Sequence, residues 1–146
     1  MSNIEQTLSI IKPDAVERNL IEEIKNIFLT NNLNIKESKK IHITKDEASE
    51  FYKVHQSKPF YNDLCAYLSS GPIVVMVLEG ENAVSANRKL MGSTNPKDAE
   101  ENTIRKIYGI FLKMIIIRCF YIIIKVFWVY HYIFKNCYFF LTRSFV

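Results

Sequence analysis

The final third of this chain lacks acidic residues. Every Asp and Glu lies at or before Glu101, whereas 12 of the 19 aromatic residues lie between positions 111 and 146. The mean hydropathy near zero therefore averages two unlike segments. We divide the chain into a domain at residues 1–110 and an atypical hydrophobic, aromatic tail at residues 111–146, because the two do not read as parts of one fold.

Cysteine is scarce and shows no pattern. The three cysteines, Cys65, Cys119 and Cys137, lack metal-ligand spacing, and residues 1–6 carry neither the basic nor the apolar part of a secretory signal. An odd cysteine count without such a signal favours a reducing compartment. We therefore expect no signal peptide, no disulfide framework and no dedicated metal site.

Long uncharged apolar runs are also missing. The apolar stretch at residues 119–134 is interrupted by Lys125, and a membrane-spanning helix needs about 18 uncharged residues. Membrane association through the tail is therefore only an alternative. The net charge of +4 comes without the basic clusters of nucleic-acid-binding proteins, so it suits an anionic ligand better than a nucleic acid.

Strand and helix patterns alternate through the first 91 residues. They predict strands at 7–11, 33–43 and 73–78, and helices at 20–28, 44–55, 60–68 and, as the last helix, 82–91. Lys12 is expected at the carboxyl end of the first strand, because Pro13 stops its pairing. Thr44 and Glu47 have capping-box spacing, and Gly92 is the expected stop of the last helix.

The order of these elements indicates an α+β fold. Strand, helix, strand, helices, strand and helix fit a ferredoxin-like split βαβ sandwich with a four-stranded antiparallel sheet, if a fourth strand follows. In the second strand, four apolar residues share one parity and are expected on one face: Leu33, Ile35, Ile41 and Ile43.

Residues 87–105 carry an arginine at each end of a long loop. Arg88, Lys89 and Arg105 can converge on one anion, since the arginine fork fits phosphate oxygens and stays charged. Thr94 adds a hydroxyl to the same loop. On spacing alone, the alternative is a solvated loop with scattered charges.

Five separated motifs resemble those of the nucleoside diphosphate kinase family. They cover about residues 6–109 in the family's order and spacing, at positions 9–16, 58–60, 70–72, 87–96 and 103–105. The resemblance implies a ferredoxin-like fold and a cytoplasmic enzyme of nucleotide metabolism that assembles as a homotetramer or homohexamer. It also implies transfer of the terminal phosphate of ATP, with Mg²⁺, to nucleoside diphosphates through a phosphorylated histidine.

The resemblance gives roles to six residues. Four would bind phosphate oxygens: Lys12, Arg88, Thr94 and Arg105. Phe60 would stack on the base, which suits an enzyme indifferent to its nucleoside, and Tyr52 would support the reacting centre through its hydroxyl. The ordinary alternatives are a surface lysine at position 12, core packing for Phe60 and a half-buried helix tyrosine at position 52.

The family pattern fails at the phosphate carrier. Counting from Arg105, the asparagine position holds Ile115 and the histidine position holds Arg118. A protonated guanidinium has no lone pair for nucleophilic attack, so we expect no catalytic residue there and an inactive enzyme. The alternatives are a nucleotide-binding module without transfer, and a membrane-associated protein driven by the tail.

The three histidines do not replace the missing one. His42 is expected to be exposed in the second strand, and His55 to be packed on a helix stripe. His131 lies in an aromatic run without a charged neighbour in sequence. None of these contexts supplies the partner that orients a nucleophilic imidazole.

Three interpretations of the tail stay open. It is a membrane segment, a divergent segment that supplies the fourth strand at about 114–119, or the translation of a family gene in a shifted reading frame. We favour the shifted frame, because Ile, Phe, Tyr and Lys are specified by AT-rich codons and the acidic residues vanish where the family pattern stops. The uncharged aromatic windows also predict poor solubility and a wrong or absent oligomer.

Overall fold

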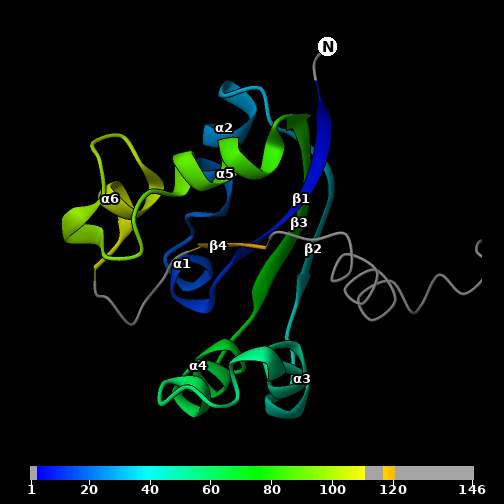
Figure 1. Ribbon diagram of the computed structural model, residues 1–146, viewed down its shortest axis with the longest axis vertical. Helices are drawn as coiled ribbons and strands as arrows, with labels where there is room; N and C mark the ends of the chain where they lie inside the picture. Colours follow the sequence, from blue (N-terminus) through cyan, green and yellow to red (C-terminus); the bar gives the residue numbers. More distant parts are fainter. Residues whose placement is uncertain (1–2, 111–116, 121–146) are drawn as a thin grey trace, which may run out of the picture.

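A four-stranded antiparallel sheet is the centre of the structure, a computed structural model that describes residues 3–110 and 117–120 (Figure 1). Its strands are β1 (Ile4–Ile11), β2 (Asn34–Ile41), β3 (Ile73–Glu81) and β4 (Ile117–Phe120). The spatial order is β2-β3-β1-β4, and each neighbouring pair is antiparallel. This order confirms the predicted ferredoxin-like α+β fold.

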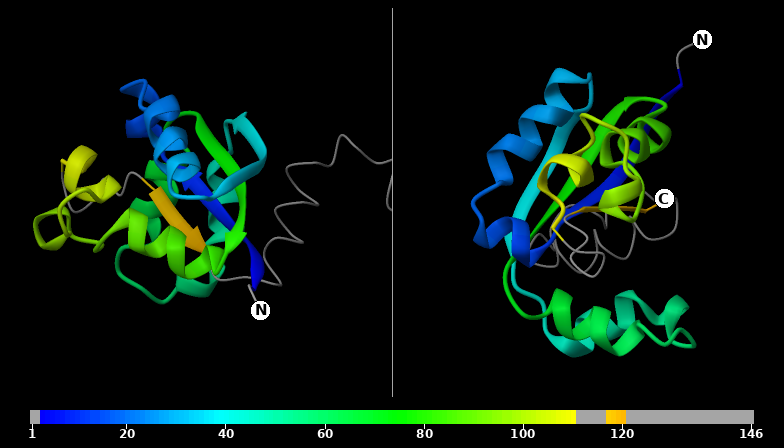
Figure 2. Two further views of the ribbon diagram at one scale, coloured as in Figure 1. Left: turned by 90° about the horizontal axis from the view of Figure 1, so that it is seen from above. Right: turned by 90° about the vertical axis from the view of Figure 1, so that its left-hand side faces the viewer.

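Helices connect the strands and flank the sheet. They are α1 (Pro13–Glu17), α2 (Ile21–Thr30), α3 (Lys45–Phe51), α4 (Tyr61–Leu68), α5 (Ala83–Met91) and α6 (Ile104–Tyr108), with 3-10 turns η1 (Lys53–His55) and η2 (Pro96–Asp98). Figure 2 shows α3 and α4 together at one end of the sheet. Residues of the other four α-helices contribute to a common buried cluster.

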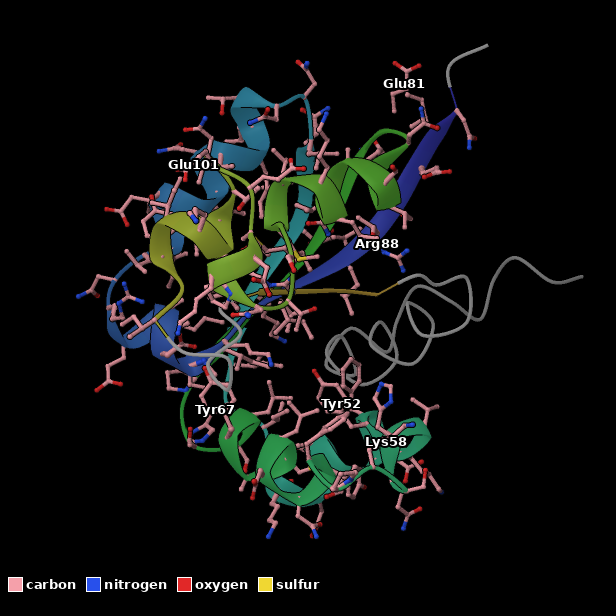
Figure 3. The ribbon with its side chains drawn as sticks, turned by 60° about the vertical axis from the view of Figure 1, so that its left-hand side comes forward. Tyr52, Lys58, Tyr67, Glu81, Arg88 and Glu101 are labelled. Carbon is pink, nitrogen blue, oxygen red and sulfur yellow. The ribbon has the colours of Figure 1, made fainter. Side chains whose placement is uncertain are left out.

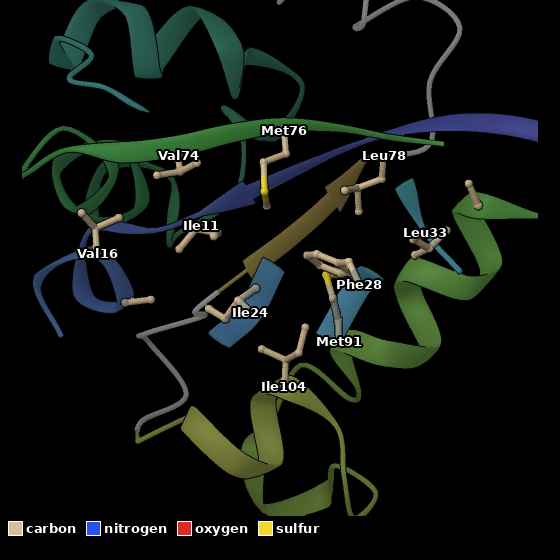
Figure 4. Close-up of a cluster of buried hydrophobic side chains, with 12 residues drawn as sticks. Ile11, Val16, Ile24, Phe28, Leu33, Val74, Met76, Leu78, Met91 and Ile104 are labelled. Atoms are coloured by element: carbon tan, nitrogen blue, oxygen red, sulfur yellow. The ribbon is translucent and has the colours of Figure 1, made fainter. Parts of the chain in front are cut away.

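The core has two parts, one on each face of the sheet. One cluster joins β1 and β3 to residues of α1, α2, α5 and α6, including Ile24, Phe28 and Ile104 (Figure 4). The other joins β1 and β3 to α3 and α4. Strand β3 is buried from Ile73 to Leu78, as its uninterrupted apolar run predicts.

The predicted single apolar face of the second strand is wrong. Leu33 and Ile35 pack with the cluster of Figure 4, whereas Ile41 and Ile43 pack with the cluster under α3 and α4. The pairing with β3 shifts between Ile35 and Glu37, which leaves one extra residue in β2. Such a bulge exchanges the two faces of a strand. Residues at odd positions therefore face one core before the bulge and the other core after it.

Two short helices were not predicted. Pro13 does more than end β1: it occupies the first turn of α1, where its missing N–H costs nothing. Helix α6 follows α5, so the helix at residues 82–91 is not the last one. With five residues each, α1 and α6 are too short for a helical period to appear in sequence.

Several local expectations are confirmed. Thr44 and Glu47 form a reciprocal capping box at the start of α3. Helix α5 ends at Met91, followed by Gly92 with φ of +81°. At that angle a Cβ would lie 2.5 Å from Thr103 Oγ1, so the chain requires glycine there.

The fourth strand lies inside the tail. One of the three interpretations of the tail placed this strand at about 114–119, and the structure has β4 at Ile117–Phe120, paired with β1 from Leu8 to Ile11. The rest of the tail, including His131 and the apolar stretch after residue 120, lies outside the described residues. The boundary at residue 110 stays a prediction.

Candidate active site

Lys12 lies where β1 ends and α1 begins. Its carbonyl accepts hydrogen bonds from the N–H groups of Ala15 and Val16, each at 3.1 Å, which fixes the backbone of the turn. The side chain is fully buried, so Lys12 is not a surface lysine. Its Nζ lies 5.4 Å from the centroid of the Tyr67 ring. The first turn of the fold thus holds an ammonium group out of bulk water.

Tyr67 joins this turn to α4. Its ring faces Lys12, and its hydroxyl donates to the carboxylate of Asp14. Burial, followed by the hydrogen bond and the negative charge of Asp14, raises the pKa of Tyr67 far above its usual range. In sequence, Tyr67 lies within the predicted helix at 60–68 and has no sign of a functional role, because no spacing pairs a residue of α4 with one of α1.

Two aromatic residues of the predicted site lie along α3 and α4. Tyr52 is fully buried at the end of α3, whereas Phe60 is 49% exposed at the start of α4. His55 lies between them, with its ring centroid 6.2 Å from each of theirs. The exposure of Phe60 argues against core packing, and leaves a ring face available to a ligand.

Helix α5 carries the first arginine of the predicted anion loop. Arg88 and Lys89 are both exposed, and Asn87 before them is buried. Figure 3 shows Arg88 on α5, with Tyr52 and Tyr67 on the pair of helices at the end of the sheet. Because successive helix residues are turned by about 100° from each other, Arg88 and Lys89 leave α5 in different directions. The convergence of Arg88, Lys89 and Arg105 on one anion stays a prediction.

The second arginine closes the loop. Arg105, on α6, is 7% exposed, and one of its terminal nitrogens donates to the Gly92 carbonyl at 2.6 Å. The N–H of Gly92 in turn donates to the carbonyl of Arg88 at 3.2 Å. The two ends of the loop are therefore in contact, and Thr94 lies exposed on the short segment between Gly92 and η2.

The position predicted for the phosphate carrier is occupied by a strand residue. Arg118 belongs to β4 and lies opposite Ile10 of β1 in the pairing register. His42 is exposed as expected, but it follows β2 instead of lying within it, and its Nε2 is 2.9 Å from the Ser69 carbonyl oxygen. His55 is half-buried beside Tyr52, in the 3-10 turn after α3.

Residues 3–110 and 117–120 lack two features that would suggest other functions. Within them, no group of three or more His, Cys, Asp or Glu side chains is placed to hold a metal ion. In that same part of the chain, none of the helices has the length and apolar character needed to cross a bilayer.

Comparison with known proteins gives consistent matches. The sequence model of the family described as "Nucleoside diphosphate kinase" matches residues 5–118. The chain is 59% identical over 102 residues to a nucleoside diphosphate kinase of Nitratiruptor, covering 70% of this chain and 74% of the relative. It is 55% identical over 102 residues to that of Nitrosococcus oceani, covering 70% and 71%.

Solved structures agree with these sequence matches. The nucleoside diphosphate kinase of Aquifex aeolicus superposes with a TM-score of 0.78 at 37% identity, covering 80% of this chain and 85% of the other. The Halobacterium salinarum enzyme, solved in complex with CDP, gives 0.77 at 38% identity, covering 80% and 77%. Together with the sheet order already described, these matches show that the chain belongs to the nucleoside diphosphate kinase family.

Proposed function

We propose that this chain binds nucleoside di- and triphosphates and does not transfer phosphate. The observation that carries the proposal is the buried ammonium of Lys12 at the carboxyl end of β1. A cation held out of water attracts an anion more strongly than a solvated one does. In support, the halobacterial relative was solved with CDP, a nucleoside diphosphate.

The bound nucleotide would engage six residues. Phe60 offers an exposed ring to the base, and stacking depends little on base identity. Tyr52 would bring its hydroxyl to the position that supports the reacting centre in the family reaction. The charge of a phosphoryl group is distributed over its oxygens and has to be neutralised. Four residues would bind these oxygens: Lys12, Arg88, Thr94 and Arg105. Mg²⁺ would arrive with the nucleotide as the MgATP complex, bound to its phosphate oxygens.

Transfer would require an imidazole where the chain has Arg118. In the family reaction, the nucleophile's lone pair attacks the terminal phosphorus, and the bond to the leaving nucleoside diphosphate breaks. Guanidinium is protonated at working pH and cannot supply that pair. The proposal therefore assigns the chain binding without the covalent intermediate.

Titration of the full chain with MgATP tests both parts. We expect saturable binding, and we expect Lys12→Met to weaken it about tenfold by removing one charge-assisted contact. Lys36→Met, on the exposed edge strand β2, is the matched control and should bind as the wild type does. Equal affinity of the Lys12→Met variant and the wild type would contradict the binding site.

The transfer part has its own measurement. After incubation with ATP labelled in the terminal phosphate, we expect no acid-labile, base-stable phosphate on the protein. Detection of such a phosphate on any histidine, with turnover, would contradict the proposal. Arg118→His alone should not restore activity, because residues that orient the ring would still be missing.

We also propose that the tail arose by a shift of reading frame in a gene for a cytoplasmic enzyme of this family. The support is the sequence itself, which loses its acidic residues and the Asn-x-x-His pattern beyond Gly109. The nucleotide sequence after the Gly109 codon tests this. If neither alternative frame encodes Asn-x-x-His followed by Ser-Asp, the proposal is wrong.

A further inference from the structure

Tyr67 makes two contacts with the turn that carries Lys12. Its ring lies 5.4 Å from Lys12 Nζ, and its hydroxyl donates to the Asp14 carboxylate, 53 residues away in sequence. Lys12 is fully buried and Asp14 is 8% exposed, so both contacts are made in a site with little water. The nucleotide-binding roles described above do not include Tyr67 or Asp14.

The two contacts act on a rigid piece of backbone. Pro13 lies between Lys12 and Asp14 at the first position of α1, and its ring fixes φ. The link after α4 also packs closely here: a Cβ on Gly71 would lie 3.3 Å from Pro13 Cβ. Because this segment is stiff, the contact of Tyr67 with Asp14 also holds the backbone of Lys12 in place relative to the Tyr67 ring.

The ring of Tyr67 also compensates for the burial of the ammonium. A cation taken out of water needs favourable electrostatics in return, and the face of an aromatic ring within about 6 Å supplies part of it. The hydrogen bond to Asp14 prevents the ring from turning away, since the hydroxyl cannot move without losing a charged acceptor. One tyrosine thus supports the lysine and is itself held by the aspartate.

We propose that Tyr67 is a positioning residue for the Lys12 ammonium, and that the pair Asp14–Tyr67 thereby raises the affinity of the site for the phosphate groups of a nucleotide. The inference rests on the proposed function, because it takes Lys12 as a phosphate-binding residue. It predicts that Tyr67 matters for nucleotides and not for the uncharged nucleoside.

Titrations of the full chain with MgATP and with adenosine test this. Tyr67→Phe keeps the ring and removes the donated hydrogen bond, so MgATP affinity should fall about fivefold. Tyr67→Leu also removes the ring face, and the loss should reach about tenfold. Affinity for adenosine should not change in either variant, whereas a merely structural role would weaken both ligands alike.

Tyr61→Phe is the matched control. It removes another tyrosine hydroxyl from α4, one that donates to the Ser49 carbonyl at 2.7 Å in α3. MgATP affinity should stay at the wild-type value in this variant. If it falls as far as in Tyr67→Phe, the effect comes from loosening α4 and the inference is wrong.

A Lys12→Met background separates the two proposals. There, Tyr67→Phe should cause no further loss of MgATP affinity, because its effect passes through the ammonium. If Lys12→Met weakens binding but Tyr67→Phe does not, or if the two losses add fully, the positioning role is overturned and the binding site stands. If Lys12→Met binds MgATP as the wild type does, the proposed function fails first and the positioning role with it.

Discussion

Asn87 is a polar side chain enclosed in the fold. It is fully buried on α5, and neither its Nδ2 nor its Oδ1 has a hydrogen-bond partner among the residues that the structure describes. A buried amide without partners costs free energy, since it has given up its hydrogen bonds to water. The neighbouring Arg88 is exposed, so the boundary between core and surface runs between these two residues.

Replacing the amide should stabilise the chain. Asn87→Leu keeps the branched shape and the number of non-hydrogen atoms and removes both unsatisfied groups, so we expect the free energy of unfolding to rise by about 1 kcal/mol. Urea unfolding followed by circular dichroism measures this. Asn62→Leu, at an exposed position of α4, is the control and should change it by no more than about 0.5 kcal/mol. A destabilised Asn87→Leu variant would contradict this expectation.

Gly92 is required by its backbone and by its neighbour. It has φ of +81°, and a Cβ would lie 2.7 Å from Thr103 Cβ. Gly92→Ala should therefore lower the free energy of unfolding by about 2 kcal/mol or more, measured by urea titration. Gly71→Ala, where the nearest atom would be at 3.3 Å, should cost clearly less. Equal costs at the two glycines would contradict this.

Tyr67 gives the stability of the chain a dependence on alkaline pH. Tyrosine in an unfolded chain ionises near pH 10, whereas burial and Asp14 raise the pKa of Tyr67 in the folded state. The stabilisation is fully present below about pH 10 and is lost above it, because the unfolded chain then gives up a proton that the folded chain keeps. The Tyr67→Phe variant should therefore lose less stability than the wild type between pH 9 and pH 11. Identical losses would contradict the raised pKa.

At the scale of the elements, helix α3 begins with a complete capping box. The N–H of Glu47 donates to Thr44 Oγ1 at 3.2 Å, and the N–H of Thr44 donates to the Glu47 carboxylate at 2.7 Å. This pattern was readable from sequence because both bonds lie within four residues. The two residues therefore fix where the chain leaves the sheet for the helices beside Tyr52.

Removing the cap should destabilise the chain by a predictable amount. Thr44→Ala is expected to lower the free energy of unfolding by about 1 kcal/mol. Ser49→Ala, which removes a bond to the Lys45 carbonyl inside the same helix, should change it by less than about 0.5 kcal/mol. A thermal melt of the three proteins compares them. If Thr44→Ala melts with the wild type, the cap contributes nothing.

The faces on which the apolar residues of strand β2 lie could not be predicted from its local sequence. Its apolar residues before and after the bulge share sequence parity, so alternation alone places them on one face. A bulge is set by pairing with β3, which the local sequence of β2 does not contain. The short α1 and α6 were missed for a related reason: each is held by tertiary contacts of a few residues, not by a helical period.

At the scale of the whole molecule, the chain joins a family domain to a segment of different composition. The family match ends at residue 118, inside β4. Beyond it, windows such as residues 126–134 are aromatic, β-prone and uncharged. Segments of that composition associate with one another when they meet in solution. Assembly of the chain is therefore expected to follow the tail more than the domain.

Light scattering of the full chain measures this assembly. We expect heterogeneous, aggregated material instead of a defined tetramer or hexamer. A charge placed in the window by Val129→Lys should reduce the aggregation, because a gatekeeper charge opposes stacking of β-prone segments. A monodisperse tetramer or hexamer of the unaltered chain would contradict the expectation.

The sequence by itself determined the order of the first three strands and the longer helices, the motif positions of Lys12 and Gly92, and the arginine at the histidine position. These are local properties, expressed in periodicity, turn residues and short spacings. Only the tertiary structure decided that Tyr67 reaches Asp14 and that Arg105 ties to the Gly92 carbonyl. Such contacts join segments far apart in the chain, and they depend on how the helices pack on the sheet, which no local pattern encodes.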